Sequence, residues 1–443
     1  MSHSTAFPRG RVDEPRGETD APAGPTQGGA GSNAGFERDT GIVNRTVLIE
    51  QVLAVLCLFL LGLRLTVHYG VTSGDVLAFL LLPLSLPTLG RYWGAKWALA
   101  CGMAAMVAGL FLSRSTAVDH VVVGRAQIAA AALLGGILLG VCTVLWARTI
   151  LPLWLVGLCF GLGSLMSVPR MTFVYSTGSW KFGYATPVTI VVLSIAVATR
   201  MKWPQLAALV GLMAVAAGTD SRSLFATYIV TGALLLCAGR YTWGDDLRAS
   251  FAKAGLLVVV LAAILTLGQT LILRGYLGAE TEQRTVLQLN RSGSLLLGGR
   301  PELVGFKSLL MEHPLGYGMG VQPNMHDISI AENAMQAIGA DPRLGGLDKY
   351  MFYSGQFELH SITADLWAPY GILGLVLAGI IAVVALRFLT AAISGSRVNA
   401  LVLFLSCVTV WDLLGTPLWT AAPTLTLLLG SAPVVARARR EQP

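Results

Sequence analysis

Charged residues are scarce in this chain of 443 residues, where Asp, Glu, Lys and Arg together make up 12%. Soluble domains carry about 25% charged residues, so the composition argues against an ordinary soluble domain. Hydrophobic residues make up 54%, and apolar runs of about 17–22 residues recur, each long enough to cross a bilayer as a helix. These runs are apolar on every face, which does not fit the alternating strands of a β-barrel. The composition therefore predicts an all-α polytopic membrane protein.

A basic stripe with interleaved aromatic residues is also lacking. The net charge of +7 comes from Lys and Arg scattered between the apolar runs. Nucleic acid is therefore not predicted as a partner, whereas the lipid bilayer is predicted as one.

Paired cysteines are lacking as well, because no CxxC spacing occurs and all six cysteines lie inside apolar runs. We interpret them as small hydrophobic residues, not as disulfides or metal ligands.

The apolar runs divide the chain into five segments. Residues 1–45 are rich in Gly, Pro, Thr and charge of both signs, which predicts a disordered tail with no apolar region of a signal peptide at its start. Nine predicted spans fill 46–273, a polar loop follows at 274–363, three more spans fill 364–436, and a basic tail ends the chain at 437–443. The spans, about twelve in all, are predicted at 46–65, 76–90, 97–113, 126–147, 149–167, 184–199, 204–219, 224–239, 254–273, 364–387, 399–414 and 417–436.

Basic residues near the span ends predict the orientation. If both termini are cytoplasmic, most of these residues fall on the inner side, as the positive-inside rule requires. The inward residues are Arg91, Lys96, Arg148, Arg200, Lys202, Arg240, Arg248, Lys253, Arg387, Arg397, Arg437, Arg439 and Arg440. The exceptions on the outer side are Arg114, Arg125, Arg170 and Lys181. This predicts a multi-pass protein of the cytoplasmic (inner) membrane with the turn 220–223 and the loop 274–363 outside.

The loop 274–363 has about 90 residues, far more than a usual connection, which indicates a function or a structure of its own. Pro301 follows Arg300 and suits the first turn of a helix. Apolar residues then recur on one predicted face, at Leu303, Phe306, Leu310 and Met311. We expect an amphipathic helix that lies along the outer membrane surface and ends before Pro314.

The sequence HPLGYGMG follows at 313–320. Its alternate glycines Gly316, Gly318 and Gly320 permit a tight turn and a close approach of backbone N–H groups to a ligand. The spacing fits neither a dinucleotide fingerprint nor a P-loop. A purely structural turn is the alternative interpretation.

Further polar residues have chemistry that suits a functional site. His360 precedes the predicted span 364–387, and an imidazole that titrates near neutral pH suits a general base, although such a residue is often structural. Arg222 in the outer turn either extends to water or offers a bidentate fork to a phosphate. Residues of metal-binding type also occur at His326, Asp327, Glu358 and His360. Their spacing matches no zinc or calcium template, so we predict neither a metal nor another cofactor.

The segments GRPELVGFKSLLMEHPLGYGMG and HSITADLWAPYGILGL resemble the paired signature of the O-antigen ligase and polymerase-like family. That signature has an Arg-led helix, an HPL-GxG turn, a variable insert and a His before a YG-x-x-G helix. The resemblance is specific over 299–375 and modest around 220–235, where the turn is similar to a Ser-Arg motif of the family. The chain departs from the family at Ser361, where Asn is frequent, and in the long insert 321–359, a candidate determinant of acceptor choice.

The resemblance implies a membrane glycosyltransferase of the cell envelope. The family moves a glycan from a polyprenyl-pyrophosphate carrier such as undecaprenyl pyrophosphate to a glycan or glycolipid acceptor outside the cytoplasmic membrane. By this resemblance His360 is the catalytic base of an inverting displacement, and Arg300 and Arg222 hold the pyrophosphate. The residues expected to shape the substrate site are His313, Gly316, Gly318, Gly320, Arg291 and Arg284.

Several alternatives remain open from the sequence. Ligase, polymerase and transfer to a protein hydroxyl are not distinguished. A transporter or flippase of lipid-linked sugars would place ionisable residues inside the spans. Such residues are sparse, with Glu50, Asp365 and Asp412 near span ends. A structural membrane anchor would leave the His and Arg residues replaceable.

Overall fold

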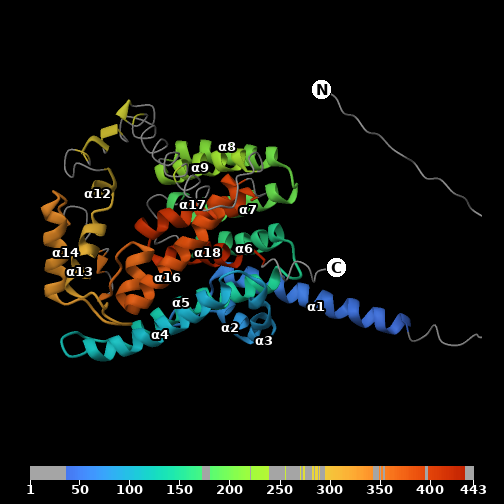
Figure 1. Cartoon of the computed structure of the whole chain (residues 1–443), viewed down its shortest axis with the longest axis horizontal. Coiled ribbons are helices and arrows are strands. Elements are labelled where there is room, and N and C mark those ends of the chain that lie inside the picture. The colour runs from blue at the N-terminus through green and yellow to red at the C-terminus, as the bar shows by residue number, and fades with distance from the viewer. Residues whose placement is uncertain are drawn as a thin grey trace, which may run out of the picture. The chain divides into compact units, whose positions relative to one another are not determined.

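The computed structural model describes residues 36–171, 180–219, 221–238, 295–342, 355–394 and 398–434, together with isolated residues between 255 and 289 and between 349 and 352. The chain divides into two units, 1–48 and 49–443. The described chain is mostly helical, with a single two-stranded ribbon in which His68 pairs with Val71. Figure 1 shows the arrangement of the elements of the second unit.

The elements follow one another in this order: α1 (Phe36–Leu63), β1 (Thr66–His68), β2 (Val71–Thr72), α2 (Ser73–Leu80), α3 (Leu82–Ser85), η1 (Leu86–Arg91), α4 (Ala95–Thr116), α5 (Gly124–Ala147), α6 (Leu153–Ser167), η2 (Val168–Met171), η3 (Trp180–Tyr184), α7 (Ala185–Ala198), α8 (Lys202–Gly218), α9 (Arg222–Cys237), α12 (Leu295–Gly299), α13 (Glu302–Glu312), α14 (Met325–Ala337), α16 (Ile362–Ile393), α17 (Ala400–Gly415) and α18 (Leu418–Gly430).

Within the described residues, four helical stretches are long and apolar enough to cross a membrane: α4, α5, η3 with α7, and α16. The segment from α2 to η1 is bent by 59° and makes a fifth if it is counted as one span. Helices occur at the other predicted positions that the structure describes, but α17 and α18 have 16 and 13 residues. At 1.5 Å per residue they are shorter than a bilayer core. The described helices therefore show four or five candidate spans, and the predicted number of about twelve stays a prediction.

Two other predictions need comment. The helix α1 begins at Phe36, within the segment 1–45 that was predicted as a tail, and the predicted disorder of that segment stays a prediction. The predicted span 254–273 lies mostly outside the described residues.

The helix α16 is the centre of the described fold and packs against α4, α17, α18 and α9. It is interrupted at Gly371, where φ is 64° and ψ is −144°, two residues after Pro369. Glycine alone adopts such a conformation at low energy. A helix interrupted here cannot use the Ala368 carbonyl in its own ladder, and that oxygen accepts from the N–H groups of Tyr317 and Gly318 at 2.9 and 3.0 Å.

The two ends of α5 lie in different surroundings. At its C-terminal end Arg148 donates to the carbonyls of Gly430 and Ala432, both at 2.8 Å. Trp93 joins this end through a hydrogen bond to Pro433, and Arg387 lies 4.1 Å from the centre of its ring. At the N-terminal end of α5, residues 121–123 pair with residues 320–322 of the loop. One end thus gathers residues predicted to face inward, and the other gathers residues predicted to face outward.

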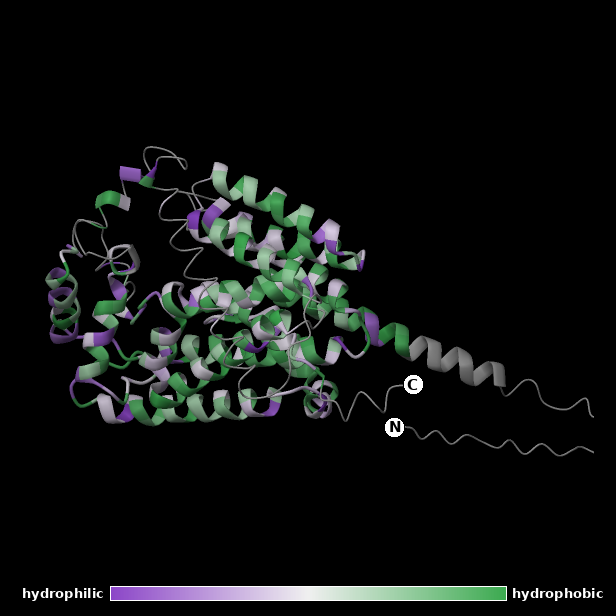
Figure 2. Cartoon of the chain, turned by 45° about the horizontal axis from the view of Figure 1, so that its top comes forward, coloured by the Kyte–Doolittle hydropathy of each residue, from purple (hydrophilic) through white to green (hydrophobic). Residues whose placement is uncertain are grey.

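A second, smaller hydrophobic core lies beneath α13 and α14, at the end of the fold that is predicted to face outward, and is called the outer core below. These two helices lie side by side beyond the ends of α4 and α16 (Figure 1). Figure 2 shows purple, hydrophilic residues about α13 and α14, whereas the long helices are largely green. The core contains Leu309 of α13, Ala331 and Met335 of α14, and Trp367 of α16. The loop 274–363 therefore has packed structure of its own.

The helix α13 ends before Pro314 as predicted, and its predicted apolar face is buried only in part, at Phe306 and Leu310. Leu309 is fully buried and Phe306 contacts Trp367 edge to face, whereas Met311 is 73% exposed. One side of α13 packs against α14, and the expectation that this helix lies along the membrane surface stays a prediction. No pattern in the insert 321–359 predicts α14 as the partner of α13.

Replacement of Gly316 tests how far the fold depends on the glycine turn. Its φ is +84°, and an added Cβ would lie 2.6 Å from the Trp367 carbonyl oxygen and 2.8 Å from Gly371 Cα. We expect Gly316→Ala to lower the free energy of unfolding by at least about 1–2 kcal/mol, because an L-residue with a left-handed backbone costs that much before any clash.

Thermal unfolding in detergent measures this effect, with Gly379→Ala as the matched control. Gly379 is exposed on α16, and no described atom lies within 4 Å of an added Cβ there. The control should be neutral or slightly stabilising. Equal melting temperatures for wild type and Gly316→Ala would contradict the role assigned to this turn.

Candidate functional site

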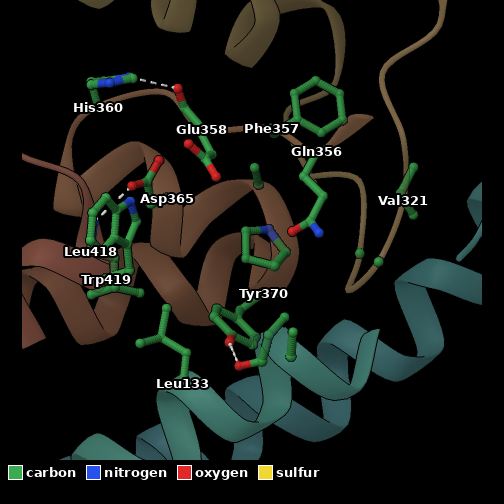
Figure 3. A pocket seen from close by; sticks show the side chains of 16 residues that line it. Leu133, Val321, Gln356, Phe357, Glu358, His360, Asp365, Tyr370, Leu418 and Trp419 are labelled. Carbon is green, nitrogen blue, oxygen red and sulfur yellow. Dashed lines mark hydrogen bonds between the residues drawn. The ribbon is translucent and has the colours of Figure 1, made fainter. Parts of the chain in front are cut away.

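A cavity of about 670 Å³ lies between the start of α16, the start of α18, α5 and the loop. Ala129, Ala130 and Leu133 of α5 form one wall, and Tyr370 and Trp419 contribute aromatic surface. The loop contributes to the wall through Gln356, Phe357, Glu358 and His360. In Figure 3 His360 and Glu358 lie at one edge of this cavity, above Asp365. Its wall therefore combines apolar and aromatic surface with acidic groups and one imidazole.

His360 has an unusual backbone conformation. Its φ is +54°, a left-handed value that few residues other than glycine adopt. The ring Nδ1 lies 2.9 Å from the Glu358 carbonyl oxygen. A carbonyl oxygen only accepts, so Nδ1 carries the proton, and in the neutral imidazole Nε2 then has the basic lone pair. Strained residues of this kind concentrate at functional sites, where the surrounding structure holds them in place.

Hydrogen bonds on both sides of His360 fix this conformation. The Asp365 carboxylate accepts from Leu359 N at 2.8 Å and from Leu418 N at 2.9 Å, and so joins the chain before His360 to the start of α18. Ser361 caps α16 by accepting from Ala364 N, and its hydroxyl donates to the Leu413 carbonyl at 2.7 Å. The backbone of His360 is therefore held from both sides.

Arg300 lies at the same end of α17 as these contacts. Its guanidinium carbon is 5.9 Å from the centre of the Trp411 ring. An added Cβ at Gly415 would lie 3.0 Å from Arg300 Nε, so this glycine makes room for the arginine. A cation at the C-terminal end of a helix is also favoured by the helix dipole. Of the described residues, Arg300 and His360 are both placed around the last turn of α17.

Arg222 reaches the same end through the pairing of α9 with α17. Tyr228 stacks on Phe404, with ring centroids 5.7 Å apart. Ala400 N, at the start of α17, donates to Gln205 of α8, and the neighbouring Lys202 hydrogen-bonds to Ala238 just after α9. The end of α9 thus lies near the start of α17, so the two helices are antiparallel.

The antiparallel arrangement puts the start of α9 beside the end of α17. Arg222, the first residue of α9, donates from Nη1 to the Thr285 hydroxyl at 2.9 Å. The predicted residues His360, Arg300 and Arg222 therefore belong to one end of the bundle. Neither arginine lies in the described wall of the cavity.

The glycine turn 316–320 forms part of the cavity surface, but its N–H groups are used within the protein. Gly316, Gly318 and Gly320 all have positive φ, as the predicted tight turn requires. Gly318 and Gly320 line the cavity. The N–H groups of residues 316–319 all donate to carbonyls of the protein, namely those of His313, Ala368 and Gly109. These four donors are directed at the protein and not at the cavity.

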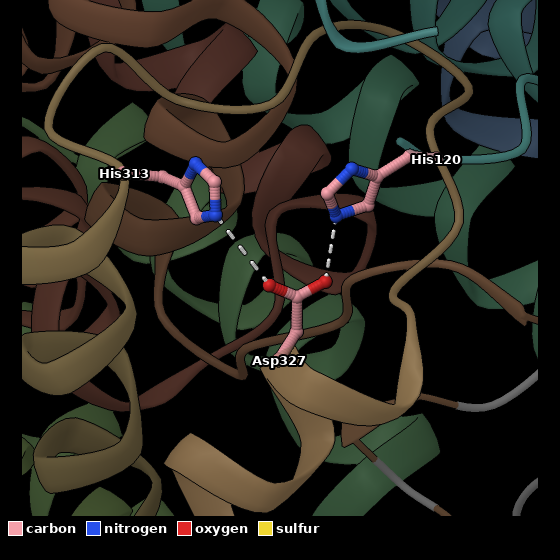
Figure 4. A group of neighbouring side chains, drawn as sticks. All are labelled: His120, His313 and Asp327. Atoms are coloured by element: carbon pink, nitrogen blue, oxygen red, sulfur yellow. Dashed lines mark hydrogen bonds and ion pairs between the residues drawn. The ribbon is translucent and has the colours of Figure 1, made fainter. Parts of the chain in front are cut away.

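His313 lies outside the cavity wall, in a second polar cluster behind the turn (Figure 4). The Asp327 carboxylate at its centre is fully buried and lies 2.8 Å from His120 Nε2 and 3.8 Å from His313 Nε2. Tyr317 donates its hydroxyl to Asp327 at 2.9 Å. Asp119 contacts His120 Nδ1 at 2.7 Å. The ring of Tyr317 stacks on Phe357 of the cavity wall at 4.2 Å between centroids, which joins the cluster to the cavity.

Electrostatics in this cluster follow from its burial. Burial, together with the charge of Asp327, raises the pKa of Tyr317 above its usual range, so the phenol stays a neutral donor. Burial also acts to lower the pKa of His120, but the hydrogen bonds to Asp119 and Asp327 and their charges outweigh it, and the net shift is upward. In the cavity wall, burial raises the pKa of Glu358.

The sequence predictions for the site divide into three groups. His360, Arg300 and Arg222 come to one end of the bundle, and Gly318 and Gly320 line the cavity. His313 and Gly316 lie behind the cavity wall, in the second cluster and against α16. The predicted substrate-binding residues Arg284 and Arg291 are outside the described residues.

Residue reasoning missed Asp119 and His120 entirely. They belong to the short connection between α4 and α5, whereas the rest of their cluster follows about two hundred positions later. A signal was present, because the span count puts this connection outside together with the loop, and it contains a histidine.

Comparisons of this chain with protein-family models, with curated proteins and with solved structures find no match.

Replacement of Glu358 tests the electrostatics of the cavity wall. A carboxyl whose pKa is raised by folding has no effect on stability at a pH below its unfolded pKa, and it destabilises the fold increasingly as the pH rises through the folded pKa. We therefore expect Glu358→Gln to be more stable than wild type at pH 8 and by a smaller margin at pH 4.5, near the ordinary pKa of Glu.

Thermal unfolding at the two pH values measures this difference. Glu312→Gln removes a half-exposed carboxylate outside the cavity wall and is the matched control for the loss of one negative charge. A stability difference for Glu358→Gln that is independent of pH would contradict the assigned effect of burial.

Proposed function

We propose that this protein is a multi-pass membrane glycosyltransferase of O-antigen ligase-like or polymerase-like type. It would transfer a glycan from a polyprenyl-pyrophosphate carrier to an acceptor hydroxyl at the outer face of the cytoplasmic membrane. The observation that carries the proposal is the position of His360. Its left-handed backbone is held on both sides, its Nδ1 contacts the Glu358 carbonyl, and it lies in the wall of a large cavity.

The lining of the cavity supports an acceptor that carries hydroxyl groups. Tyr370, Phe357 and Trp419 offer ring faces and edges to the apolar surface of a sugar. Glu358 and Asp365 offer oxygen acceptors to its hydroxyl protons. A pyrophosphate would be repelled by these carboxylates when they are ionised. The proposal therefore assigns the cavity to the acceptor.

The arginines support a separate place for the donor. Arg300 and Arg222 lie at the end of α17, to which Ser361 next to His360 is also hydrogen-bonded. Guanidinium groups bind phosphate oxygens through two parallel hydrogen bonds. The proposal assigns the pyrophosphate to this side, so that His360 lies between the donor and the acceptor.

The reaction needs positioning and charge stabilisation more than covalent catalysis. His360 Nε2 would take the proton of the acceptor hydroxyl while its oxygen forms a bond to the anomeric carbon. The bond from that carbon to the pyrophosphate oxygen breaks at the same time, and the polyprenyl pyrophosphate leaves with the bonding electron pair. A single displacement of this kind inverts the anomeric configuration. The contact with the Glu358 carbonyl would keep the reactive tautomer of His360 in place.

Two further observations support the proposal. The motif resemblance over 299–375 covers both α13 with its glycine turn and the start of α16, which pack on one another through Ala368 and Trp367. Residues predicted to face inward lie at one end of α5, and the loop lies at the other end. The cavity and the loop would therefore share the outer side.

Glycan transfer by purified protein tests the proposal. Wild type, His360→Ala, Arg300→Ala and Arg222→Ala would be given a polyprenyl-pyrophosphate glycan and candidate glycan or glycolipid acceptors. We expect His360→Ala to lose about 10²–10⁴-fold in the rate of transfer, the usual contribution of a general base. Loss of one arginine should cost about 10²–10³-fold, as for other groups that stabilise developing charge.

The matched controls replace a histidine and an arginine that lie away from the proposed site. His326→Ala removes an exposed histidine near α13, and Arg387→Ala removes an arginine at the other end of α16 that contacts Trp93. Both should turn over within about twofold of wild type, because surface substitutions away from a site have small effects. Full activity of His360→Ala would refute the mechanism. Movement of the lipid across a bilayer without glycan transfer would favour a flippase.

A further inference from the structure

The cluster behind the glycine turn has the composition and geometry of a metal site. Its three central side chains are His120, His313 and Asp327, and their candidate ligand atoms all lie within 4.8 Å of one another. They come from the α4–α5 connection, from the residue after α13 and from the first turn of α14. We propose that these three residues bind one divalent transition-metal cation of the zinc type. This inference is independent of the proposed glycan transfer.

The separations suit a common cation. Zinc binds imidazole nitrogen and carboxylate oxygen at about 2.0–2.2 Å, so the ligand atoms around it lie roughly 3–3.5 Å apart. The Asp327 oxygens lie 2.8 Å from His120 Nε2 and 3.8 Å from His313 Nε2, values on either side of that spacing. Small side-chain movements would bring all three groups to bonding distance. Both imidazoles present the same nitrogen, Nε2, to the carboxylate between them (Figure 4).

The surrounding hydrogen bonds match those of metal-binding histidines and carboxylates. A metal-binding histidine usually donates its second ring N–H to a carboxylate, which fixes the ring and its tautomer. Asp119 provides this carboxylate for His120, at 2.7 Å from Nδ1. Tyr317 and the backbone N–H of Asn324 donate to the two oxygens of Asp327, both at 2.9 Å. The proposed ligands are thus oriented by the protein before any cation binds.

The types of ligand and the exposure of the three side chains indicate which cation the site would prefer. Two imidazoles and one carboxylate favour zinc and its transition-metal neighbours over magnesium and calcium, which prefer oxygen ligands. The side chains of His120 and Asp327 are 1% and 0% exposed, whereas His313 is 30% exposed. The site therefore opens to solvent only at His313, where water can complete a four-coordinate shell.

A cation here would connect three segments that are remote in the sequence. The α4–α5 connection would be held to the start of α14, and both to the end of α13. Tyr317 continues this connection to Phe357 in the cavity wall. The cation would thus stabilise the outer hydrophobic core beneath α13 and α14, and its removal should lower the stability of the whole chain.

Zinc binding by the full-length protein in detergent tests the inference. The protein is treated with a chelator, exchanged into chelator-free buffer and titrated with zinc chloride by calorimetry, with metal content measured by mass spectrometry. We expect one zinc per chain and a higher melting temperature with zinc but not with magnesium. Cobalt in place of zinc should give the visible absorption of a four-coordinate site.

Two variants at the edge of the cluster keep the test independent of folding. His313→Ala removes the partly exposed ligand. Asp119→Asn alters only the carboxylate that orients His120, and the Asp119 side chain is 62% exposed. We expect zinc affinity to fall about 10–100-fold in Asp119→Asn, the usual effect of removing such an orienting group, and at least as much in His313→Ala. Their melting temperatures without zinc show whether each variant is folded.

Two controls match these variants in residue type. His326→Ala removes an exposed histidine that pairs with Glu312, and Asp341→Asn removes an exposed carboxylate beyond the other end of α14. Both should bind zinc as wild type does. The proposal is overturned if folded wild type takes up no zinc. It is equally overturned if His313→Ala and Asp119→Asn bind zinc as tightly as their controls.

Discussion

The interruption of α16 at Gly371 is the constraint on which the outer half of the described structure depends. An unbroken helix would use the Ala368 carbonyl for its own ladder, and in an apolar environment a free backbone group is costly. Here that oxygen accepts from Tyr317 and Gly318 of the glycine turn. The turn in turn positions Tyr317 against Asp327 and Gly318 in the cavity wall. One break in a helix thus anchors both polar sites.

The helices could be predicted from the sequence more fully than their partners. Apolar runs predicted the positions of the long apolar helices, and Pro314 predicted the end of α13, because both signals are local. The buried face of α13 was predicted only in part, because the burial of Leu309 depends on α14 in an insert with no recognisable pattern. Asp119 and His120 were missed for a similar reason. Their importance comes from a contact with Asp327 that no local periodicity encodes.

For the candidate site, residue chemistry could be predicted and geometry could not. The type of His360 and its place before α16 indicated a general base, but its left-handed backbone depends on Asp365 and Ser361 bonding to two other helices. The approach of Arg222 to the end of α17 depends on the antiparallel pairing of α9 and α17. The separation of the acidic cavity from the side that contains the arginines likewise could not be predicted, because it depends on how the helices pack.

The first turns of α16 belong to both hydrophobic cores. Ile362, Leu366 and Tyr370 are part of the larger core, whereas Ala364, Trp367 and Ala368 are part of the outer one. If α13 and α14 rotated together as a rigid lid, the outer core would have to separate from α16. That helix also belongs to the larger core. The shared first turns of α16 therefore join α13 and α14 to the rest of the bundle as one packed unit.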